Sequence, residues 1–140
     1  MWIEVVLFLL LVICAVTDSI RKEIPLAVIW VGIFLAVACH VLGCMGEETW
    51  SAVVLSMFPG AAFWGISLVT GEKVGYGDGW ILVMIGVFTD FRRCFMILLV
   101  GLMLESVVVL FLLAVRKIST DKEIPFAPFL LMGMGVIVWL

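Results

Sequence analysis

Six long apolar segments, separated by short stretches rich in charge and turn residues, constrain the fold of this 140-residue chain more than any other feature. The chain is 66% hydrophobic and only 14% charged, whereas a soluble domain carries about 25% charged residues. It has too little polar surface to cover a water-soluble globule, so its expected solvent is lipid. The uncharged runs lie at about residues 5–17, 26–46, 49–71, 79–89, 94–115 (interrupted only by Glu105) and 124–140.

These runs predict an all-α, polytopic integral membrane protein with about six transmembrane helices. A spanning helix needs about 20 residues, with a range of roughly 17–25. The first segment carries Glu4 instead of the positive charge that opens a cleaved signal peptide, so we expect it to be a permanent span. We expect one membrane-embedded domain over residues 1–140, with helices at about 2–17, 25–43, 50–70, 79–90, 93–115 and 124–140.

The lysines and arginines indicate how these helices are oriented. With the N-terminus outside, six of the eight basic residues fall in the inner loops, and only Arg92 and Arg93 fall in the outer loops. Because basic residues collect in cytoplasmic loops, this orientation is the favoured one. The chain has no basic stripe of the kind that binds nucleic acid. The expected surroundings are therefore the lipid bilayer, with no nucleic-acid partner.

The residues that commonly bind metals are scattered along the chain. The four cysteines, Cys14, Cys39, Cys44 and Cys94, form no C-x-x-C pair of the kind found in zinc sites. The single histidine, His40, lies near the predicted outer end of its helix and has the position of an interfacial residue. We therefore predict no metal site and no cofactor.

Two aspartates lie at helix ends that the predicted orientation puts on the same, inner side. Asp18 ends the first predicted helix, and Asp78 begins the fourth. Two carboxyl groups about 3 Å apart cannot both ionise, so they share one proton. Such a pair can activate a water molecule and protonate a carbonyl oxygen, which hydrolyses a peptide bond without a metal. The pair titrates as a unit, so neither acid can be assigned one role.

Each acidic residue also has a structural interpretation. Asp78 and its glycines can form an ordinary turn in which the carboxylate only caps the next helix. Asp18, close to Arg21 and Lys22, can be a solvated loop charge. Glu105 lies near the middle of the fifth predicted helix, where an ionisable group is costly. Two roles stay open for it, a hydrogen bond to a neighbouring helix and a part in substrate or proton traffic.

The glycines around Asp78 suggest how a substrate is held. Gly75, Gly77 and Gly79 bracket Tyr76 and Asp78, and residues without a Cβ permit close backbone approach. An extended substrate strand can hydrogen-bond to such a backbone, so we predict that residues 75, 76, 77 and 79 bind substrate. The helix predicted from Gly79 is only about 18 Å long, against a hydrocarbon core of about 30 Å. This shortfall predicts a water-accessible niche around Asp78.

Three segments, in this order and each at a helix boundary, resemble the type IV prepilin peptidase family. The segment "GYGDGW" resembles the family's G-x-G-D motif, which holds Asp78. In "TDSIRKEIP", the residues that match the family's first signature are Asp18, Arg21, Ile24 and Pro25. In "IPFAPFL", the residues that match its final-helix segment are Pro125, Phe126 and Pro128.

The resemblance implies a GxGD membrane aspartic endopeptidase whose two catalytic aspartates are Asp18 and Asp78. Its substrates would be type IV pilin-like or related secretion-system subunits that carry an N-terminal leader and a hydrophobic helix. Cleavage of the leader would take place at the cytoplasmic face of a bacterial or archaeal plasma membrane. The sequence contains no segment comparable to the cysteine-bearing cytoplasmic domain of larger members, so the resemblance implies the compact, peptidase-only form.

The sequence departs from the family pattern at a few positions and leaves two alternatives. Leu26 stands where the family often has asparagine, and Gly79 and Trp80 stand where it often has valine and lysine. One alternative is a GxGD protease of the presenilin or signal-peptide-peptidase type. Such proteases have tyrosine before the first aspartate, whereas Thr17 precedes Asp18 here. The other alternative is a non-catalytic membrane scaffold of a secretion system.

Overall fold

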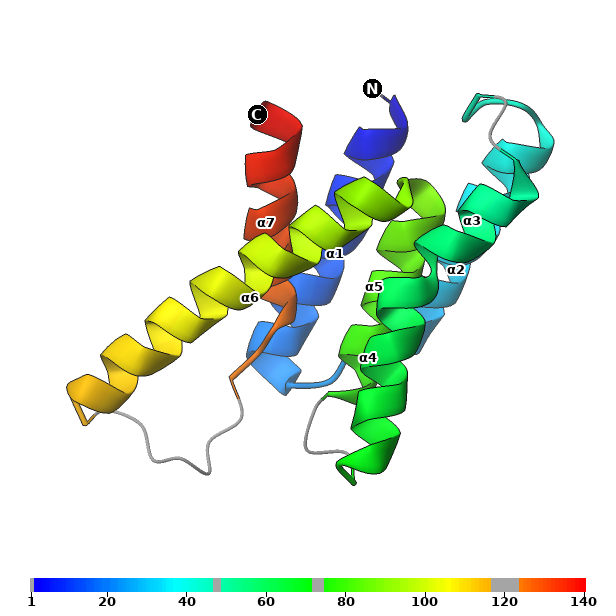
Figure 1. The fold of residues 1–140 in the computed structure, drawn as a ribbon. Helices are drawn as coiled ribbons and strands as arrows, with labels where there is room; N and C mark the ends of the chain where they lie inside the picture. The colour runs from blue at the N-terminus through cyan, green and yellow to red at the C-terminus, as the bar shows by residue number, and fades with distance from the viewer. Residues whose placement is uncertain (1, 47–48, 72–74, 117–123) are drawn as a thin grey trace.

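The computed structural model describes residues 2–46, 49–71, 75–116 and 124–140, and within these ranges the regular elements are all helices (Figure 1). The predicted all-helical membrane fold with six apolar segments is confirmed, and one of these segments is divided into two helices. The helices are α1 (Trp2–Arg21), α2 (Leu26–Val41), α3 (Trp50–Ser56), α4 (Phe58–Val69), α5 (Tyr76–Phe88), α6 (Phe91–Ala114) and α7 (Ala127–Trp139).

The division between α3 and α4 has a local cause in the sequence. Pro59 lies in the first turn of α4, and a proline cannot donate the helical hydrogen bond and crowds the carbonyl four residues before it. The hydroxyl of Ser56, at the end of α3, lies 2.7 Å from the Val53 carbonyl and 2.6 Å from the Gly86 carbonyl. The break therefore places a polar group where it contacts α5.

Three helix boundaries differ from the predicted ones in ways that affect the site. The helix α1 continues past Asp18 and ends at Arg21, where Lys22 adopts the left-handed conformation with φ 52°. The helix α5 begins at Tyr76, before Asp78. Both aspartates thus lie inside helices, because each is on a face that packs against the core. The predicted helix at 124–140 begins only at Ala127, so Pro125 precedes it and Pro128 occupies its first turn.

The helices have two length classes. Three apolar segments have the length of a membrane span, namely Trp2–Arg21, Trp50–Val69 (α3 with α4) and Phe91–Ala114. The other three, α2, α5 and α7, have 16, 13 and 13 residues. At 1.5 Å per residue, α5 is about 20 Å long, which is shorter than the hydrocarbon core. The fourth segment was predicted to be shorter than the hydrocarbon core, and α2 and α7 are shorter than it as well.

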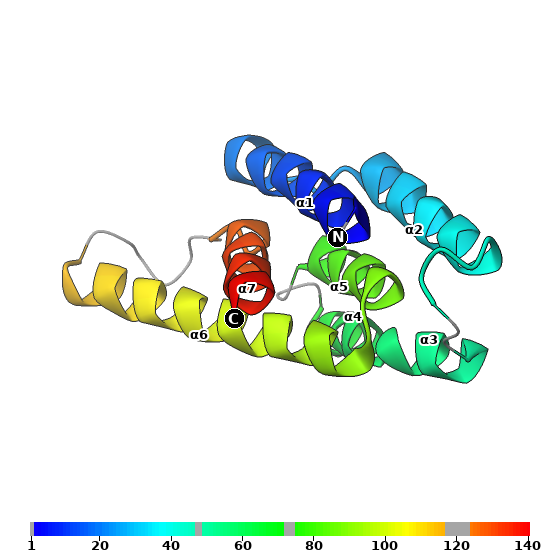
Figure 2. The ribbon, with the colours of Figure 1, turned by 90° about the horizontal axis from the view of Figure 1, so that it is seen from above.

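The helix α5 is the centre of the bundle. Seen from above, it lies among α1, α2, α4, α6 and α7 (Figure 2), and every residue from Ile81 to Phe88 is buried. A helix that is apolar on all sides is expected to be buried in this way. Its surroundings fix the position of Asp78 at its first turn.

Glycines allow α4 and α5 to approach closely. A Cβ added at Gly60 of α4 would lie 2.5 Å from the backbone nitrogen of Val83. A Cβ added at Gly79 of α5 would lie 3.1 Å from the backbone nitrogen and Cβ of Trp64. Small residues are the usual means by which helices pack closely in membranes. The packing of α5 on α4 thus depends on these two positions.

Candidate active site

The carboxyl group of Asp18 is directed into the bundle by the periodicity of α1. Asp18 lies on the same buried stripe as Leu7, Leu11 and Cys14, because residues at this spacing share one helix face. It is only 7% exposed. The backbone N–H of Ala127, the first residue of α7, donates a hydrogen bond to Asp18 Oδ2 at 3.1 Å. The amides at a helix start have no partner within the helix, so α7 supplies a donor that orients Asp18.

Asp78 lies in the first turn of the central helix and is only 8% exposed. Its backbone N–H bonds to the carbonyl of Gly75, the N-cap residue, at 3.1 Å. The Asp78 carboxyl turns back over Gly75, so that a Cβ added at Gly75 would collide with Asp78 Oδ2. The first glycine of the G-x-G-D motif therefore leaves the space that this carboxyl occupies.

The fold places the two aspartates at the same end of the bundle. The end of α1 and the start of α5 both lie there (Figure 1), and both carboxyl-bearing side chains are buried. No ion pair joins either acid to a lysine or arginine within the described ranges. Arg21 and Lys22, which follow Asp18, are exposed. That the two acids share one proton stays a prediction.

Gly77, the second glycine of the motif, and Gly79, which follows the motif, are in contact with neighbouring residues. A Cβ added at Gly77 would lie 2.6 Å from the Ile24 side chain, and Gly79 lies against Trp64. These contacts give both glycines a packing role at the site. Their contribution to substrate binding stays a prediction.

Aromatic rings surround the start of α5. The ring of Tyr76, which is 37% exposed, lies 5.9 Å from that of Trp64 and 6.4 Å from that of Trp80. Offset or edge contacts at such distances are favourable for aromatic pairs. Tyr76 is thus an exposed side chain two residues from a buried acid, held by rings of α4 and α5.

Glu105 is a further acidic group within the helices. It is half-buried on α6. Neither of the two roles left open for Glu105 is decided by this placement. Within the described residues, no three histidine, cysteine or acidic side chains are grouped as metal ligands.

Two components of the site did not follow from the motifs. The Ala127 N–H is a backbone donor, so its side chain gave no signal, although the prolines of "IPFAPFL" mark a helix start with free amides. The packing of Trp64 against Gly79 depends on how α4 and α5 cross, which no local pattern specifies. The buried stripe of α1 could have shown that Asp18 faces inward, because its spacing is visible in the sequence.

Comparison with known proteins gives one family and several relatives. The model of the type IV leader peptidase family matches residues 5–113, a range that includes both aspartates. A prepilin leader peptidase/N-methyltransferase of Pseudomonas putida is 28% identical over 127 residues, which are 87% of this chain and 44% of that protein. A protein of the same name from Stutzerimonas stutzeri is 27% identical over 119 residues, which are 84% of this chain and 41% of that protein.

A third relative, the prepilin leader peptidase/N-methyltransferase of Pseudomonas aeruginosa, is 26% identical over 118 residues, 81% of this chain and 40% of that protein. The chain therefore spans less than half the length of these relatives. No solved structure gives a significant match.

Proposed function

Because the chain belongs to the type IV leader peptidase family, we propose that it is an aspartic endopeptidase that removes leader peptides from type IV pilin-like or related secretion-system subunits. Cleavage takes place at the cytoplasmic face of the plasma membrane of a bacterium or archaeon. The observation that carries this proposal is that Asp18 and Asp78 are both buried and lie at the same end of the bundle. The proposal concerns the peptidase activity alone.

The reaction follows from one proton shared by two acids. The ionised carboxylate takes a proton from a water molecule, whose oxygen attacks the carbonyl carbon of the scissile bond. The protonated acid donates to the carbonyl oxygen, and a proton is later delivered to the leaving amine as the C–N bond breaks. The N–H of Ala127 holds the Asp18 carboxyl in one orientation during these steps. Because the two acids titrate as a pair, the roles of general base and general acid are not assigned to one aspartate each.

Burial supports this chemistry. Each aspartate is less than a tenth exposed, so the niche predicted around Asp78 is narrow, and charge interactions are stronger in such a low-dielectric site than in solution. A buried acid without a cationic partner is costly to a fold. Two such acids at the same end of the bundle (Figure 1) are consistent with a chemical role.

The substrate enters as an extended strand followed by a hydrophobic helix. The peptide bonds within a helix are shielded, so the residues around the scissile bond must be unwound to be attacked. We propose that the backbone at Gly75 and Gly77 and the side chain of Tyr76, with Gly79 behind them, position this strand. The exposure of Tyr76 beside buried Asp78 supports this placement. The hydrophobic helix of the substrate stays in the bilayer beside the bundle.

Cleavage of a defined substrate tests the proposal. The purified protein is incubated with a short leader-bearing pilin subunit, and the mass of the product is measured. We expect the wild-type protein to release the leader and the Asp18→Asn and Asp78→Asn variants to release none. Glu23→Gln, a change at an exposed acid outside the pair, is the matched control and is expected to cleave normally. Absence of product with the wild-type protein would favour the non-catalytic scaffold.

A further inference from the structure

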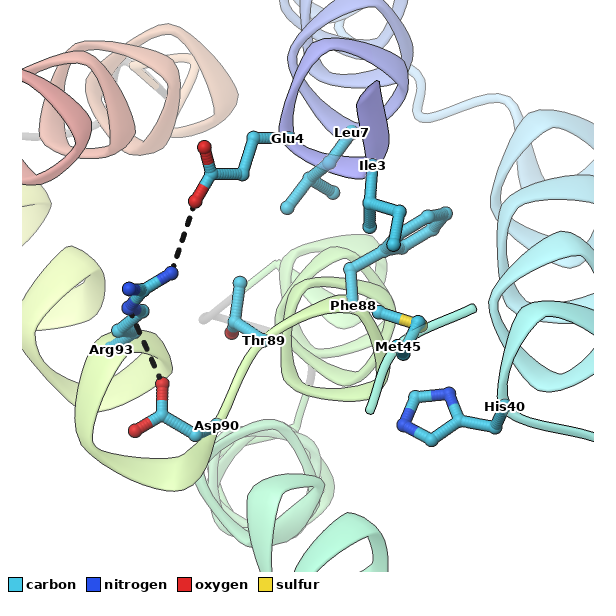
Figure 3. Close-up of a pocket in the computed structure, with 9 residues that line it drawn as sticks. All are labelled: Ile3, Glu4, Leu7, His40, Met45, Phe88, Thr89, Asp90 and Arg93. Carbon is cyan, nitrogen blue, oxygen red and sulfur yellow. Dashed lines mark hydrogen bonds and ion pairs between the residues drawn. The ribbon is translucent and has the colours of Figure 1, made fainter. Parts of the chain in front are cut away.

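A cavity of about 390 Å³ (Figure 3) opens at the end of the bundle where α1 begins and α5 ends, whereas Asp18 and Asp78 lie where α1 ends and α5 begins (Figure 1). It lies between the first turns of α1, the end of α2 and the corner that joins α5 to α6. Its apolar wall includes Ile3, Leu7 and Phe88. Its polar lining consists of Glu4, His40, Thr89, Asp90 and Arg93. The leader peptidase reaction uses none of these polar groups.

Three of the five polar side chains that line this cavity, Glu4, Thr89 and Asp90, offer hydrogen-bond acceptors. The His40 Nδ1 lies 2.9 Å from the Ala36 carbonyl, and a carbonyl can only accept, so Nδ1 carries a proton and donates this bond. The Thr89 hydroxyl donates to the Ile85 carbonyl at 2.7 Å, which leaves its oxygen as an acceptor. An acceptor-rich lining suits a ligand that brings several N–H donors.

Each carboxylate of the cavity has one oxygen that can still accept a hydrogen bond from a ligand. Arg93 Nη1 bonds to Glu4 Oε1 at 3.0 Å, and Arg93 Nε lies 3.7 Å from Asp90 Oδ1 (Figure 3). In the part of the chain that is described, Glu4 Oε2 and Asp90 Oδ2 make no hydrogen bond. Two carboxylates and one guanidinium leave the lining with one negative charge in excess. The cavity therefore favours a cationic group over an anionic one.

The position of the cavity is that of lipid headgroups. Both chain termini lie at this end of the bundle (Figure 1). The adjoining tryptophans, Trp2 and Trp139, are 84% and 90% exposed, and exposed tryptophans at helix ends mark the boundary between lipid and water. Among the lipids with a cationic group at this level, the aminophospholipids are those whose ammonium carries N–H donors.

A second cavity extends the first toward apolar surroundings. It has a volume of about 80 Å³ and shares Glu4, Thr89 and Arg93 with the larger one. Its other walls come from α6 and α7 and are apolar, with Ile97, Met134 and Ile137 among them. The lining thus changes from polar to apolar side chains, as a lipid changes from its polar headgroup to its hydrocarbon portion. A small soluble amine has no hydrocarbon portion to place against the apolar side chains.

We propose that this pair of cavities binds an aminophospholipid of the phosphatidylethanolamine type. Its primary ammonium donates hydrogen bonds to Glu4 and Asp90, which lie on the two sides of Arg93 (Figure 3). Its phosphate lies at the mouth of the cavity beside Arg93, which is 59% exposed. A choline headgroup carries the same charges but has no N–H donor, so it cannot make these bonds. The site thus distinguishes two zwitterionic lipids that differ only in their N–H groups.

Lipid binding to the purified, delipidated protein in detergent tests the proposal without any variant. Phosphatidylethanolamine, phosphatidylcholine and phosphatidylglycerol with identical acyl chains are titrated separately, with thermal unfolding and native mass spectrometry as readouts. A ligand that binds only the folded protein raises the unfolding temperature, and by more the larger the ratio of its free concentration to its Kd. We expect phosphatidylethanolamine to bind at least about tenfold more tightly than phosphatidylcholine, the ratio given by one hydrogen bond to a charged group.

Two variants locate the effect in the cavity. Glu4→Gln and Asp90→Asn remove negative charge while keeping side-chain size, and each is expected to reduce the preference for ethanolamine over choline by about tenfold. Arg92→Gln, a change at the exposed neighbour of Arg93, is the control and is expected to leave the preference intact. Soluble phosphoethanolamine, titrated separately, is expected to bind much more weakly than the lipid.

Three outcomes would overturn the proposal. Equal binding of the ethanolamine and choline lipids would show that N–H donors are not recognised. Tighter binding of phosphatidylglycerol would show that Arg93 makes an anion site. Binding of soluble phosphoethanolamine as tight as that of the lipid would exclude a lipid as the ligand. Leader cleavage is not a readout here, so failure of this proposal is independent of the proposed enzyme activity.

Discussion

The two ends of the helix bundle hold charged residues in opposite circumstances. At one end, Asp18 and Asp78 are 7% and 8% exposed, and no described lysine or arginine pairs with them. At the other end, Glu4 and Arg93 are 37% and 59% exposed and form an ion pair at 3.0 Å. Buried acids without a cationic partner are costly, whereas an exposed ion pair contributes about 0–1 kcal/mol. The first end therefore indicates a chemical requirement, and the second is expected to affect activity and stability little.

The largest effect is expected from the two aspartates. Asp18→Asn and Asp78→Asn each remove one member of the shared-proton pair, so each is expected to lower the rate of leader cleavage by about 10³-fold or more. The double variant is expected to be no slower than either single variant, because groups that act as a unit are not additive. Initial rates of product formation, measured by mass spectrometry, check both statements. Multiplicative losses in the double variant would show that the acids act independently.

A smaller loss of activity is expected from Gly75→Ala. The added Cβ would collide with the Asp78 carboxyl and displace it from its position. A misplaced catalytic group costs about 10²-fold in rate, and the fold is expected to remain intact because the conflict is with one side chain. Cleavage rate and thermal unfolding are measured together. Gly135→Ala, where a Cβ meets nothing within 4 Å, is the matched control, and equal activity of the two variants would contradict the positioning role.

The sequence allowed most of the fold to be predicted because apolar runs directly reflect a membrane environment. It also pointed to Asp18 and Asp78 as the candidate acids, since each lies in a segment with a family resemblance, and both are buried; their catalytic role stays a prediction. The positions of helix ends were less predictable. The start of α5 at Tyr76 and the end of α1 at Arg21 depend on packing against other helices, which a local pattern of charge and glycine does not contain.

The cavity opposite the aspartates was not predicted for a similar reason. Glu4, His40 and Arg93 were recognisable only as single residues near helix ends, and they belong to three helices that are far apart in the sequence. Which helix ends meet is set by the crossing of α1, α2 and α6. Long-range packing of this kind has no signature in a single sequence.

A third, smaller effect, on stability, is expected where α4 packs closely against α5, the helix that carries Asp78. Gly60→Ala is expected to lower the free energy of unfolding by about 1–3 kcal/mol, because the added Cβ meets the Val83 backbone, which cannot easily move. Gly65→Ala, five residues further along α4 at a position with nothing within 4 Å, is expected to be neutral or to stabilise by up to about 1 kcal/mol. Thermal unfolding in detergent compares the two. Equal stability would show that α5 is not held by its contact with α4.

The smallest effect is expected from the ion pair at the opposite end. In a double-mutant cycle with Glu4→Gln and Arg93→Gln, the coupling energy is expected to be about 1 kcal/mol or less, because both side chains are substantially exposed. Added salt should reduce it further. The cycle is measured by unfolding of the four proteins in the same detergent, without added lipid, so that ligand binding does not contribute.

A coupling energy well above about 1 kcal/mol would show that Glu4 and Arg93 do not behave as an ordinary exposed ion pair. The pair joins α1, which carries Asp18, to α6, which directly follows α5 and its Asp78. A strong interaction there would act on the angle between α1 and α6, and through α6 on the position of α5. Its removal would then lower leader cleavage as well as stability, and the two ends of the bundle could no longer be treated as independent. Weak coupling with unchanged cleavage is the result expected if the position of the aspartates depends on helix packing alone.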